Sequence, residues 1–489
     1  MSLDVTGIDK KSIGQKVTIE ISDNHPLIRL ANKLPWEDML AIILPDLKNT
    51  EKEQYWRGRP LKIRIHLGVY LLQQMYNLTD RQAEYALKDN AAFQLFCGRG
   101  IVDKWHAPDH TKIEDFRSRL MPETQRQLAN IITAHAAKLN YACPTEVDID
   151  STAQDANISP PSLVNLLLKL AVMAKKIAKA LVDIRPDLVS KYNIKLGWIR
   201  SLVLNYYSER RAKKTLDEER NKRHKENHEY LIRKIWSMVF ESVVPIAKDA
   251  YQLLEVTSLG KYWGLRQTIE TLTWRGMQFL DDMHAWFNHQ APRPRLYSFH
   301  ARQVQCFNKN KIGKQIQYGR HYQIARVKGN FAYVGPCVDL QMADAPSVKL
   351  MVAEHGRIFD SEHKVEDSNL VNIKSIAFDR GYHSHQNKEF LESCGIQEIY
   401  LPKRRRYDWE IPDLDKETEV KLHNRRAGIE AIIGHIKHGG QLRRSRMKSD
   451  NTTLSAGYSA ILGFNLRQLR RYATGKVRPI YDNEQKMVA

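Results

Sequence analysis

The stretch that decides the fold is His423-Asn424-Arg425-Arg426-Ala427-Gly428-Ile429-Glu430-Ala431-Ile432-Ile433-Gly434-His435-Ile436-Lys437. Arg426, Glu430 and Lys437 are spaced by four and seven positions, so a helix would place them along one stripe. The opposite stripe is apolar and would pack onto a core; it consists of Ile429, Ile432, Ile433 and Ile436. A carboxylate between two cations suits a metal-bound phosphodiester site. Taken alone, however, the pattern is also that of an ordinary amphipathic helix.

Two further acids follow segments with the pattern of buried strands. The segment 145–152 alternates in polarity and reaches Asp150 just before a Ser-Thr pair. The segment 375–378 is apolar and stops at Asp379, which a glycine turn follows. We therefore expect each acid at the end of its strand. Two such acids, with Glu430 on a helix, can build a hard-cation site from oxygen ligands.

These residues carry a family resemblance. Asp150, Asp379 and Glu430 resemble the DDE triad of bacterial insertion-sequence transposases, which have an RNase H-like core. The helix resembles the Tyr-x2-Arg-x3-Glu-x6-Lys signature of that group, with His423 at the tyrosine position. Other segments that resemble the group are Asp150-Ser151-Thr152, Asp379-Arg380-Gly381-Tyr382, Arg57-Gly58-Arg59-Pro60, Gln73-Gln74-Met75-Tyr76, Leu78-Thr79-Asp80-Arg81-Gln82, Pro108-Asp109-His110-Thr111 and Phe116-Arg117.

The resemblance implies a two-metal site for DNA cleavage and strand transfer. Two Mg²⁺ ions, for which Mn²⁺ should substitute, would be bound by the three carboxylates. Asp150 would bridge the ions, and Asp379 and Glu430 would hold one each. Water would first cut a strand at the end of the element, and the freed 3′-OH would then attack target DNA.

Two alternatives stay open at this site. Asp148 shares the strand face of Asp150 and competes with it as the first ligand, as does Asp155 less well; the Ser-Thr pair after Asp150 favours that residue. Arg426 and Lys437 are interpreted as phosphate clamps. The alternative for them is an Arg–Glu salt bridge beside a solvated lysine.

The composition favours a polyanionic partner. The chain has 489 residues, a formal net charge of +20 and a pI near 9.5. Nucleic acid is the usual partner of so basic a protein, although an acidic membrane surface or plain solubility would also fit the charge. The five cysteines are dispersed, which argues against a disulfide framework and a thiolate zinc site.

We expect a cytoplasmic, nucleoid-associated bacterial protein that does not enter a membrane. The N-terminal residues lack a signal-peptide pattern, and no apolar run is long enough to span a bilayer. The sequence also lacks a phosphate-binding glycine-rich loop, so no nucleotide cofactor is expected.

The periodicity predicts a division of the chain into several parts. They are a polar arm (1–25), a helical N-terminal DNA-binding domain (26–135), a catalytic core (140–159 and 290–475), a helical insertion within it (160–289) and a tail (476–489). Helices over 61–75 and 80–96 are typical of a helix-turn-helix type DNA binder, the alternative being a plain helical bundle.

The expected fold class of the core is α/β with a mixed sheet. Two meander strands over 314–327 and 331–340 would lie beside the strand that carries Asp150. A crossover helix over 347–359 would lead to the strand that ends at Asp379. Further elements are expected over 387–394 (helix), 398–402 (strand) and 454–472 (helix). Such a sheet covered by helices is consistent with an RNase H-like core.

Basic clusters near these motifs are the candidate DNA contacts. The expected contacts are Arg57, Arg59, Arg404, Arg405, His423, Arg426, Lys437, Arg443 and Arg444, and the cluster from Arg467 to Arg471 is another candidate. Each cluster could equally be a solubilising face. Because three of them bracket one candidate active site, DNA contact is favoured.

The function predicted from these patterns is a DDE transposase that cuts and joins double-stranded DNA at the terminal inverted repeats of an insertion sequence. Pairing of two ends implies a homodimer in the DNA complex. The alternatives are a decayed or domesticated copy that binds DNA without cutting it, and an RNase H-like nuclease without strand transfer.

Overall fold

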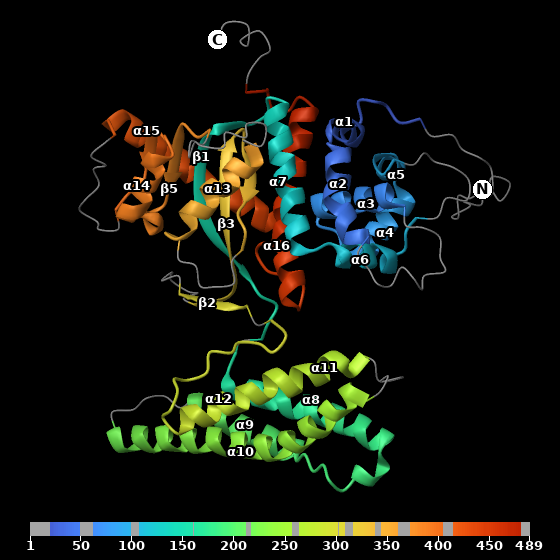
Figure 1. The fold of residues 1–489 in the computed structure, drawn as a ribbon, viewed down its shortest axis with the longest axis vertical. Coiled ribbons are helices and arrows are strands. Elements are labelled where there is room, and N and C mark those ends of the chain that lie inside the picture. Colours follow the sequence, from blue (N-terminus) through green and yellow to red (C-terminus); the bar gives the residue numbers. More distant parts are fainter. Residues whose placement is uncertain are drawn as a thin grey trace, which may run out of the picture. The chain divides into compact units, whose positions relative to one another are not determined.

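The computed structural model describes residues 20–48, 62–98, 107–159, 161–211, 217–256, 264–301, 303–308, 316–337, 344–359, 372–403 and 414–480. Contacts divide the chain into two compact units, both visible in Figure 1. Unit 1 comprises Met1–Asn157, Cys306–Met447 and Asn451–Ala489, and unit 2 comprises Ile158–Gln305 with Lys448–Asp450. Each unit has a hydrophobic core of its own. Within the described ranges, no helix has the length and apolarity that a membrane crossing requires.

Unit 1 opens with a group of helices. They are α1 (Pro26–Lys33), α2 (Trp36–Lys48), α3 (Ile63–Tyr76), α4 (Asp80–Asp89), α5 (Ala91–Phe96), α6 (His110–Arg119) and α7 (Pro122–Lys138). The prediction of one helix over 80–96 was wrong. Asn90 adopts an extended conformation that ends α4, and its side-chain oxygen accepts from the Phe93 N–H and caps α5. At the other end of α4, Thr79 and Gln82 form a reciprocal capping box.

The mixed sheet lies in unit 1. Its strands are β1 (Cys143–Asp155), β2 (Gln305–Asn308), β3 (Ile316–Lys328), β4 (Phe331–Val334), β5 (Ser375–Phe378) and β6 (Glu398–Tyr400). The order is β2–β3–β1–β5–β6, and β4 also pairs with β3. The pairs β1–β3 and β3–β4 are antiparallel, whereas β1–β5 and β5–β6 are parallel. The predicted α/β class with a mixed sheet is confirmed.

One strand is longer than predicted. The antiparallel ladder between β1 and β3 continues to the pair Asp155–Gly319. Asp150 therefore lies within β1 and not at its end. β5, in contrast, is short and ends at Phe378, directly before Asp379, as predicted.

Helices cover the sheet. They are α13 (Ser347–Phe359), α14 (His385–Ser393), α15 (Lys416–Gly439) and α16 (Asp450–Ala473), and a 3₁₀ turn, η6, spans Arg380–Tyr382. Figure 1 shows α7 and α16 side by side along the sheet. The buried Asn465 of α16 joins them to β4, since its amide donates to the carbonyls of Ala129 and Ala332 and its oxygen accepts from the Ala332 N–H. Arg126 of α7 forms a buried ion pair with Glu354 of α13.

The predicted helix at the centre of the sequence argument is α15. Asp415 caps its N-terminus by accepting from the Thr418 N–H. The expected apolar stripe is buried; it consists of Ile429, Ile432, Ile433 and Ile436. The helix contacts β1, β3, β5 and β6. The prediction of a helix that packs one apolar face onto the core is confirmed.

Helices make up most of the described part of unit 2. Its helices are α8 (Leu163–Ile184), η3 (Pro186–Leu188), α9 (Leu196–Arg211), α10 (Glu218–Val256), α11 (Arg266–Glu270), the π-helical turn η5 (Thr271–Gly276) and α12 (Met277–Phe287). The core of unit 2 is formed by residues that recur at helical spacing, such as Leu163, Leu167, Leu170 and Ala174 on α8.

Candidate active site

The register of two neighbouring strands places two of the predicted acids beside each other. Ile149 of β1 is the parallel partner of Phe378 of β5. The residues that follow them are Asp150 and Asp379, so the two carboxylates lie side by side where the parallel ladder ends. Asp379 also caps the turn η6, because its side chain accepts from the Arg380 N–H at 2.8 Å. Asp150 accepts from the Ser151 N–H at 2.7 Å.

Arg426 of α15 connects the third acid to this pair. Its Nη2 lies 3.0 Å from Oε1 of Glu430 and 3.6 Å from Oδ1 of Asp379. Glu430 and Asp379 are exposed, at 66% and 47% of the side-chain surface, whereas Arg426 is largely covered at 15%. The Arg426–Glu430 salt bridge, which is the alternative to a phosphate contact of Arg426, is therefore present. One guanidinium brings all three predicted acids into a single neighbourhood.

Negative charge exceeds positive charge around Asp150. Burial, together with the nearby carboxylates of Asp379 and Asp344, raises the pKa of Asp150 to about 6, against the opposing effects of the Ser151 N–H and Arg426. A carboxylate whose neighbours are other carboxylates is stabilised by a bound cation. The oxygen donors fit Mg²⁺ or Mn²⁺. In the described parts of the chain, however, no group of three His, Cys, Asp or Glu residues already has the geometry to hold a metal ion.

Asp148, the rival to Asp150, has a different environment. It is almost completely buried, and its carboxylate lies 2.8 Å from Nε of Arg425 and 3.2 Å from Nε of Arg326. Arg425 also donates to Ser375 of β5 and to the Val147 carbonyl. Both oxygens of Asp148 are thus engaged in fastening α15 to the sheet. The structure favours Asp150 as the acid available to a ligand.

A hydrogen-bonded chain that sequence reasoning missed supports the turn after Asp379. The buried Tyr382 donates its hydroxyl to Oε1 of Gln323 at 2.5 Å, and Nε2 of Gln323 lies 3.4 Å from Oδ1 of Asp344. Asp344 thereby becomes a fourth acid of the neighbourhood. A methyl group at Gly381 would lie 2.6 Å from Oδ2 of Asp344, so only glycine leaves room for this carboxylate.

The sequence carried one usable signal for this chain of contacts. Gly381 and Tyr382 belong to the segment already noted around Asp379, and a glycine in such a turn indicates a close approach. Nothing in the sequence marks Gln323 or Asp344, because they come from β3 and from the turn before α13. Only the folded sheet brings them beside Tyr382.

The remaining signature residues have individual surroundings. The exposed His423 contacts β6, where its Nδ1 lies 2.9 Å from the Tyr400 hydroxyl. Lys437 is half-buried near the end of α15 and has an interaction partner. Their contacts with DNA stay predictions.

The basic clusters differ in how far their side chains are exposed and free to contact DNA. Arg443 and Arg444 are exposed, and their backbone is fixed against the end of β1, since the Asp155 N–H donates to the Arg443 carbonyl at 3.1 Å. Arg467 is not a surface residue: its guanidinium donates to the carbonyls of Met75 and Gly439, and burial lowers its pKa. Arg467 thus fastens α16 to its neighbours and does not fit a phosphate contact.

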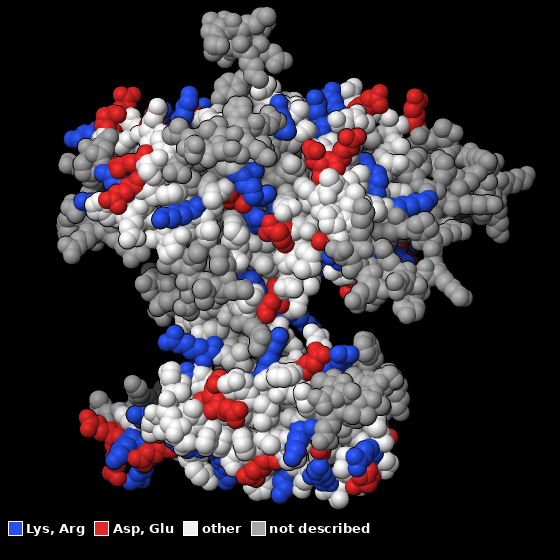
Figure 2. Space-filling model, viewed as in Figure 1, with Lys and Arg blue, Asp and Glu red and all other residues white. Residues whose placement is uncertain are grey.

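No single basic face emerges from the view in Figure 2, where Lys and Arg are interspersed with Asp and Glu among the described residues. Four of the expected DNA contacts lie outside the described residues; they are Arg57, Arg59, Arg404 and Arg405.

Comparisons with known proteins point to transposases. Residues 16–119 match the family model of a transposase domain, DUF772, and the described part of this segment forms α1–α6. A Rhizobium meliloti protein named "Uncharacterized protein ORF8 in nfe locus" is 25% identical over 165 residues, which are 32% of this chain and 75% of that protein. No solved structure matches the chain. The N-terminal segment is therefore similar to a transposase domain, and the match does not extend to the acidic site.

Proposed function

We propose that this protein is a DDE transposase that cleaves and joins double-stranded DNA at the terminal inverted repeats of an insertion sequence. One observation carries the proposal: Asp150 and Asp379 lie on neighbouring parallel strands, and Arg426 connects Asp379 to Glu430. The mixed sheet, with its meander strands on one side of β1 and its parallel strands on the other, supports an RNase H-like core. The transposase-domain match in the N-terminal segment supports the same function independently.

Asp150, Asp379 and Glu430 would hold two Mg²⁺ ions, with Mn²⁺ as a substitute. The fit rests on their oxygen donors and on the burial and neighbouring carboxylates that raise the pKa of Asp150. When bound, the ions would neutralise the phosphate, activate the attacking oxygen and stabilise the leaving oxygen. Glu430 is exposed and is held only by Arg426 among the contacts described above, so it is free to turn toward a cation.

The reaction consists of two displacements at phosphorus. Water attacks the phosphodiester at the end of the element, the P–O3′ bond breaks, and a 3′-OH is released. That hydroxyl then attacks a phosphodiester of the target strand and displaces its 3′ oxygen. Arg426 lies beside both Asp379 and Glu430, where its guanidinium can bind a phosphate oxygen. Neither step needs a nucleotide cofactor.

DNA binding would involve the N-terminal helices of unit 1 and the segment that follows α15. The transposase-domain match supports an N-terminal contact with terminal-repeat DNA, and the exposed Arg443 and Arg444 follow α15 directly. Two DNA ends must be paired before transfer, so we propose that a homodimer forms in the DNA complex.

The decisive experiment is cleavage of a labelled duplex that carries the terminal repeat flanking this gene, with Mg²⁺, for wild type and Glu430→Gln. We expect nicking at the repeat boundary in wild type and a loss of at least about 10³-fold in the variant, because a metal ligand is removed. DNA binding should persist, because Glu430 is an exposed acid whose loss adds no repulsion.

Two other outcomes would separate the alternatives. Binding without cleavage by either protein, with Mn²⁺ as well as Mg²⁺, would indicate a decayed DNA-binding copy. Cleavage without joining, when a pre-cut 3′-OH end and target DNA are supplied together, would indicate an RNase H-like nuclease. Absence of specific binding would refute the proposal.

A further inference from the structure

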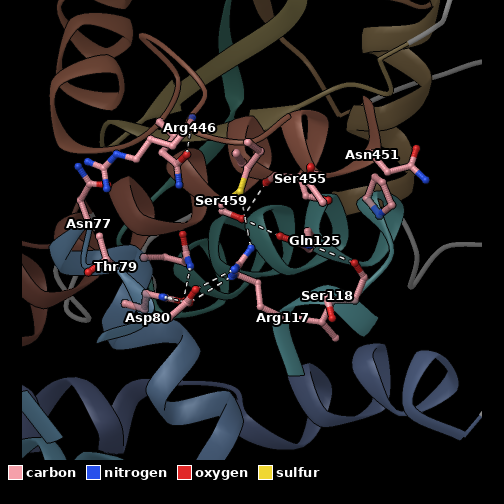
Figure 3. A pocket seen from close by; sticks show the side chains of 18 of the residues that line it. Asn77, Thr79, Asp80, Arg117, Ser118, Gln125, Arg446, Asn451, Ser455 and Ser459 are labelled. Atoms are coloured by element: carbon pink, nitrogen blue, oxygen red, sulfur yellow. Dashed lines mark hydrogen bonds and ion pairs between the residues drawn. The ribbon is translucent and has the colours of Figure 1, made fainter. Parts of the chain in front are cut away.

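Unit 1 contains a cavity of about 300 Å³, lined by both polar and apolar side chains, that the acidic site does not use. Its lining comes from the α3–α4 turn, the α6–α7 connection, the loop that follows α15, and α16. Figure 3 shows these elements around one space, with Asn77 and Thr79 on one side of it and Asn451 and Ser455 on the other. The cavity therefore joins part of the segment that matches a transposase domain to the chain that directly follows the catalytic helix.

The polar part of the lining contains several hydrogen-bonding groups. Amides, hydroxyls and the guanidinium groups of Arg117 and Arg446 contribute to it, and Asp80 is its acid. The charge of Asp80 is compensated, because its carboxylate lies 2.9 Å from Nη2 of Arg117 and accepts from Gln73 at 2.7 Å. Arg446 is exposed and adds a second positive charge at the rim. Such a lining binds an anion that carries several acceptor oxygens.

The walls of the cavity are fixed. On the floor, the buried Gln125 accepts from the hydroxyls of Tyr70 and Ser459, both at 2.7 Å. The loop that carries Arg446 is held at two points: the Ser445 N–H donates to the Asp155 carbonyl at 2.9 Å, and the Arg446 N–H donates to Oε1 of Gln441 at 3.0 Å. The floor of the cavity and the loop that carries Arg446 are therefore already in place before any ligand binds, which lowers the entropic cost of binding.

We propose that this cavity binds the sugar–phosphate backbone of the terminal-repeat DNA, with Arg446 contacting a phosphate at its rim. The inference rests on the proposed function. Arg, Ser, Thr, Asn and Gln side chains are those that proteins use for phosphate and sugar contacts, which set the register of a duplex without reading its sequence. The C-terminus of α15 is about 14 Å from Glu430 along the helix axis, at 1.5 Å per residue. A backbone held here would thus fix the distance between the repeat and the cutting site.

The test measures binding of the full-length protein to a fluorescent terminal-repeat duplex by anisotropy, over a series of salt concentrations. Arg446→Gln should weaken binding about five- to tenfold and lower the salt-dependence slope by about one. Ser118→Trp places a bulky, uncharged side chain at an exposed lining position, and should weaken binding at least as much. The matched control is Thr111→Trp, which is exposed two turns earlier on α6 and outside the lining.

The tryptophan pair distinguishes an occupied cavity from a general effect of surface charge. Ser118→Trp binding weakly while Thr111→Trp binds like wild type, with equal melting temperatures for both, would support the proposal. Equal binding by the two tryptophan variants would overturn it, even if Arg446→Gln binds weakly. If wild type itself fails to prefer the repeat over a scrambled duplex, the proposed function fails, and the cavity proposal fails with it.

Discussion

Helix α15 forms two ion-pair networks with the sheet. The adjacent residues Arg425 and Arg426 each belong to one of them. Arg425 enters a closed network in which Asp148 and Arg326 are also largely buried, with side-chain exposures of 12%, 2% and 15% for the three residues. Arg426 enters an open one, in which it shares two exposed acids, Asp379 and Glu430. One helix thus carries a structural network and a candidate reactive network one residue apart.

The difference between them lies in charge balance and access. In the closed network Arg425 and Arg326 face the buried Asp148, and Arg425 also lies 3.5 Å from Glu146, so two cations meet two carboxylates and the charges balance. In the open network one guanidinium faces several carboxylates, and the pKa of Asp150 is raised by burial and by its acidic neighbours. Excess like charge with solvent access is typical of a functional site, whereas a saturated buried pair is typical of a fastening.

The largest effect is expected from breaking the closed network. Asp148→Ala removes the buried carboxylate that Arg425 and Arg326 share, leaves Arg425 with the partly exposed Glu146, and should cost about 3–5 kcal/mol of unfolding free energy. Hydrogen exchange of the β1 and β5 peptides would locate the loss in the sheet of unit 1. The control is Glu430→Ala, whose exposed salt bridge should contribute about 0.5 kcal/mol or less. Equal effects of the two substitutions would contradict the comparison.

The open network predicts an unusual pH dependence. The folded-state pKa of Asp150, about 6, lies above the ordinary aspartate pKa of 3.8, so between these values the folded state binds more protons than the unfolded state. Stability from this group is therefore present at low pH and lost as the pH rises from about 4 to 6. At 1.36 kcal/mol per pKa unit, the loss is at most about 3 kcal/mol.

The measurement is the difference in unfolding free energy between wild type and Asp150→Asn in EDTA, from pH 4 to 7.5. Asparagine does not titrate, so the unfolding free energy of the variant relative to wild type should increase as the pH rises. The variant should be the more stable protein at pH 7.5. A difference independent of pH would show that the charge of Asp150 is already compensated in the folded state.

The sequence predicted what depends on local periodicity and strand ends. The apolar stripe of α15, the crossover helix α13 at Ser347–Phe359, the strand β4 and the position of Asp379 after β5 all followed from patterns within a few turns of chain. The offset of Arg426 and Glu430 on one helix was equally local, and the distance of 3.0 Å agrees with it.

What the sequence did not predict depends on partners far along the chain. The length of β1 is set by its ladder with β3, and the segment Ile158–Gln305 of unit 2 separates the two strands in the sequence. Asp148 became a structural residue only because Arg326 and Arg425 converge on it from β3 and α15. Asp344 joined the acids through the turn before α13. In each case the sequence shows which residue is present, but it does not show which residues surround it in the folded chain.

Two glycines of α15 sharpen the comparison, with effects expected in opposite directions. A methyl group at Gly428 would lie 2.0 Å from Nη1 of Arg326, so Gly428→Ala must displace a guanidinium of the closed network. We expect a net loss of about 1–2 kcal/mol, after the helix-propensity gain of alanine. Gly434 has nothing within 4 Å of such a methyl group, so Gly434→Ala should gain about 0.5–1 kcal/mol. Urea unfolding of both variants gives the two signs, and stabilisation by Gly428→Ala would contradict the tight packing of Arg326.

The smallest effect is expected from a change in the side chain of Tyr382, which supports the turn after Asp379. Tyr382→Phe removes the hydroxyl that donates to Gln323 and should cost about 1 kcal/mol of stability. Because Tyr382 ends the turn that Asp379 caps, cleavage should fall about three- to tenfold. It should also require more Mg²⁺ for half-maximal rate, which a loss of packing alone would not change. Tyr400→Phe removes a hydroxyl that contacts His423 and not the turn after Asp379, so it serves as the matched control and should retain the Mg²⁺ dependence of wild type. An unchanged Mg²⁺ requirement in Tyr382→Phe would show that this tyrosine contributes to packing only. The acids would then be positioned by their strands without help from the Tyr382 hydroxyl.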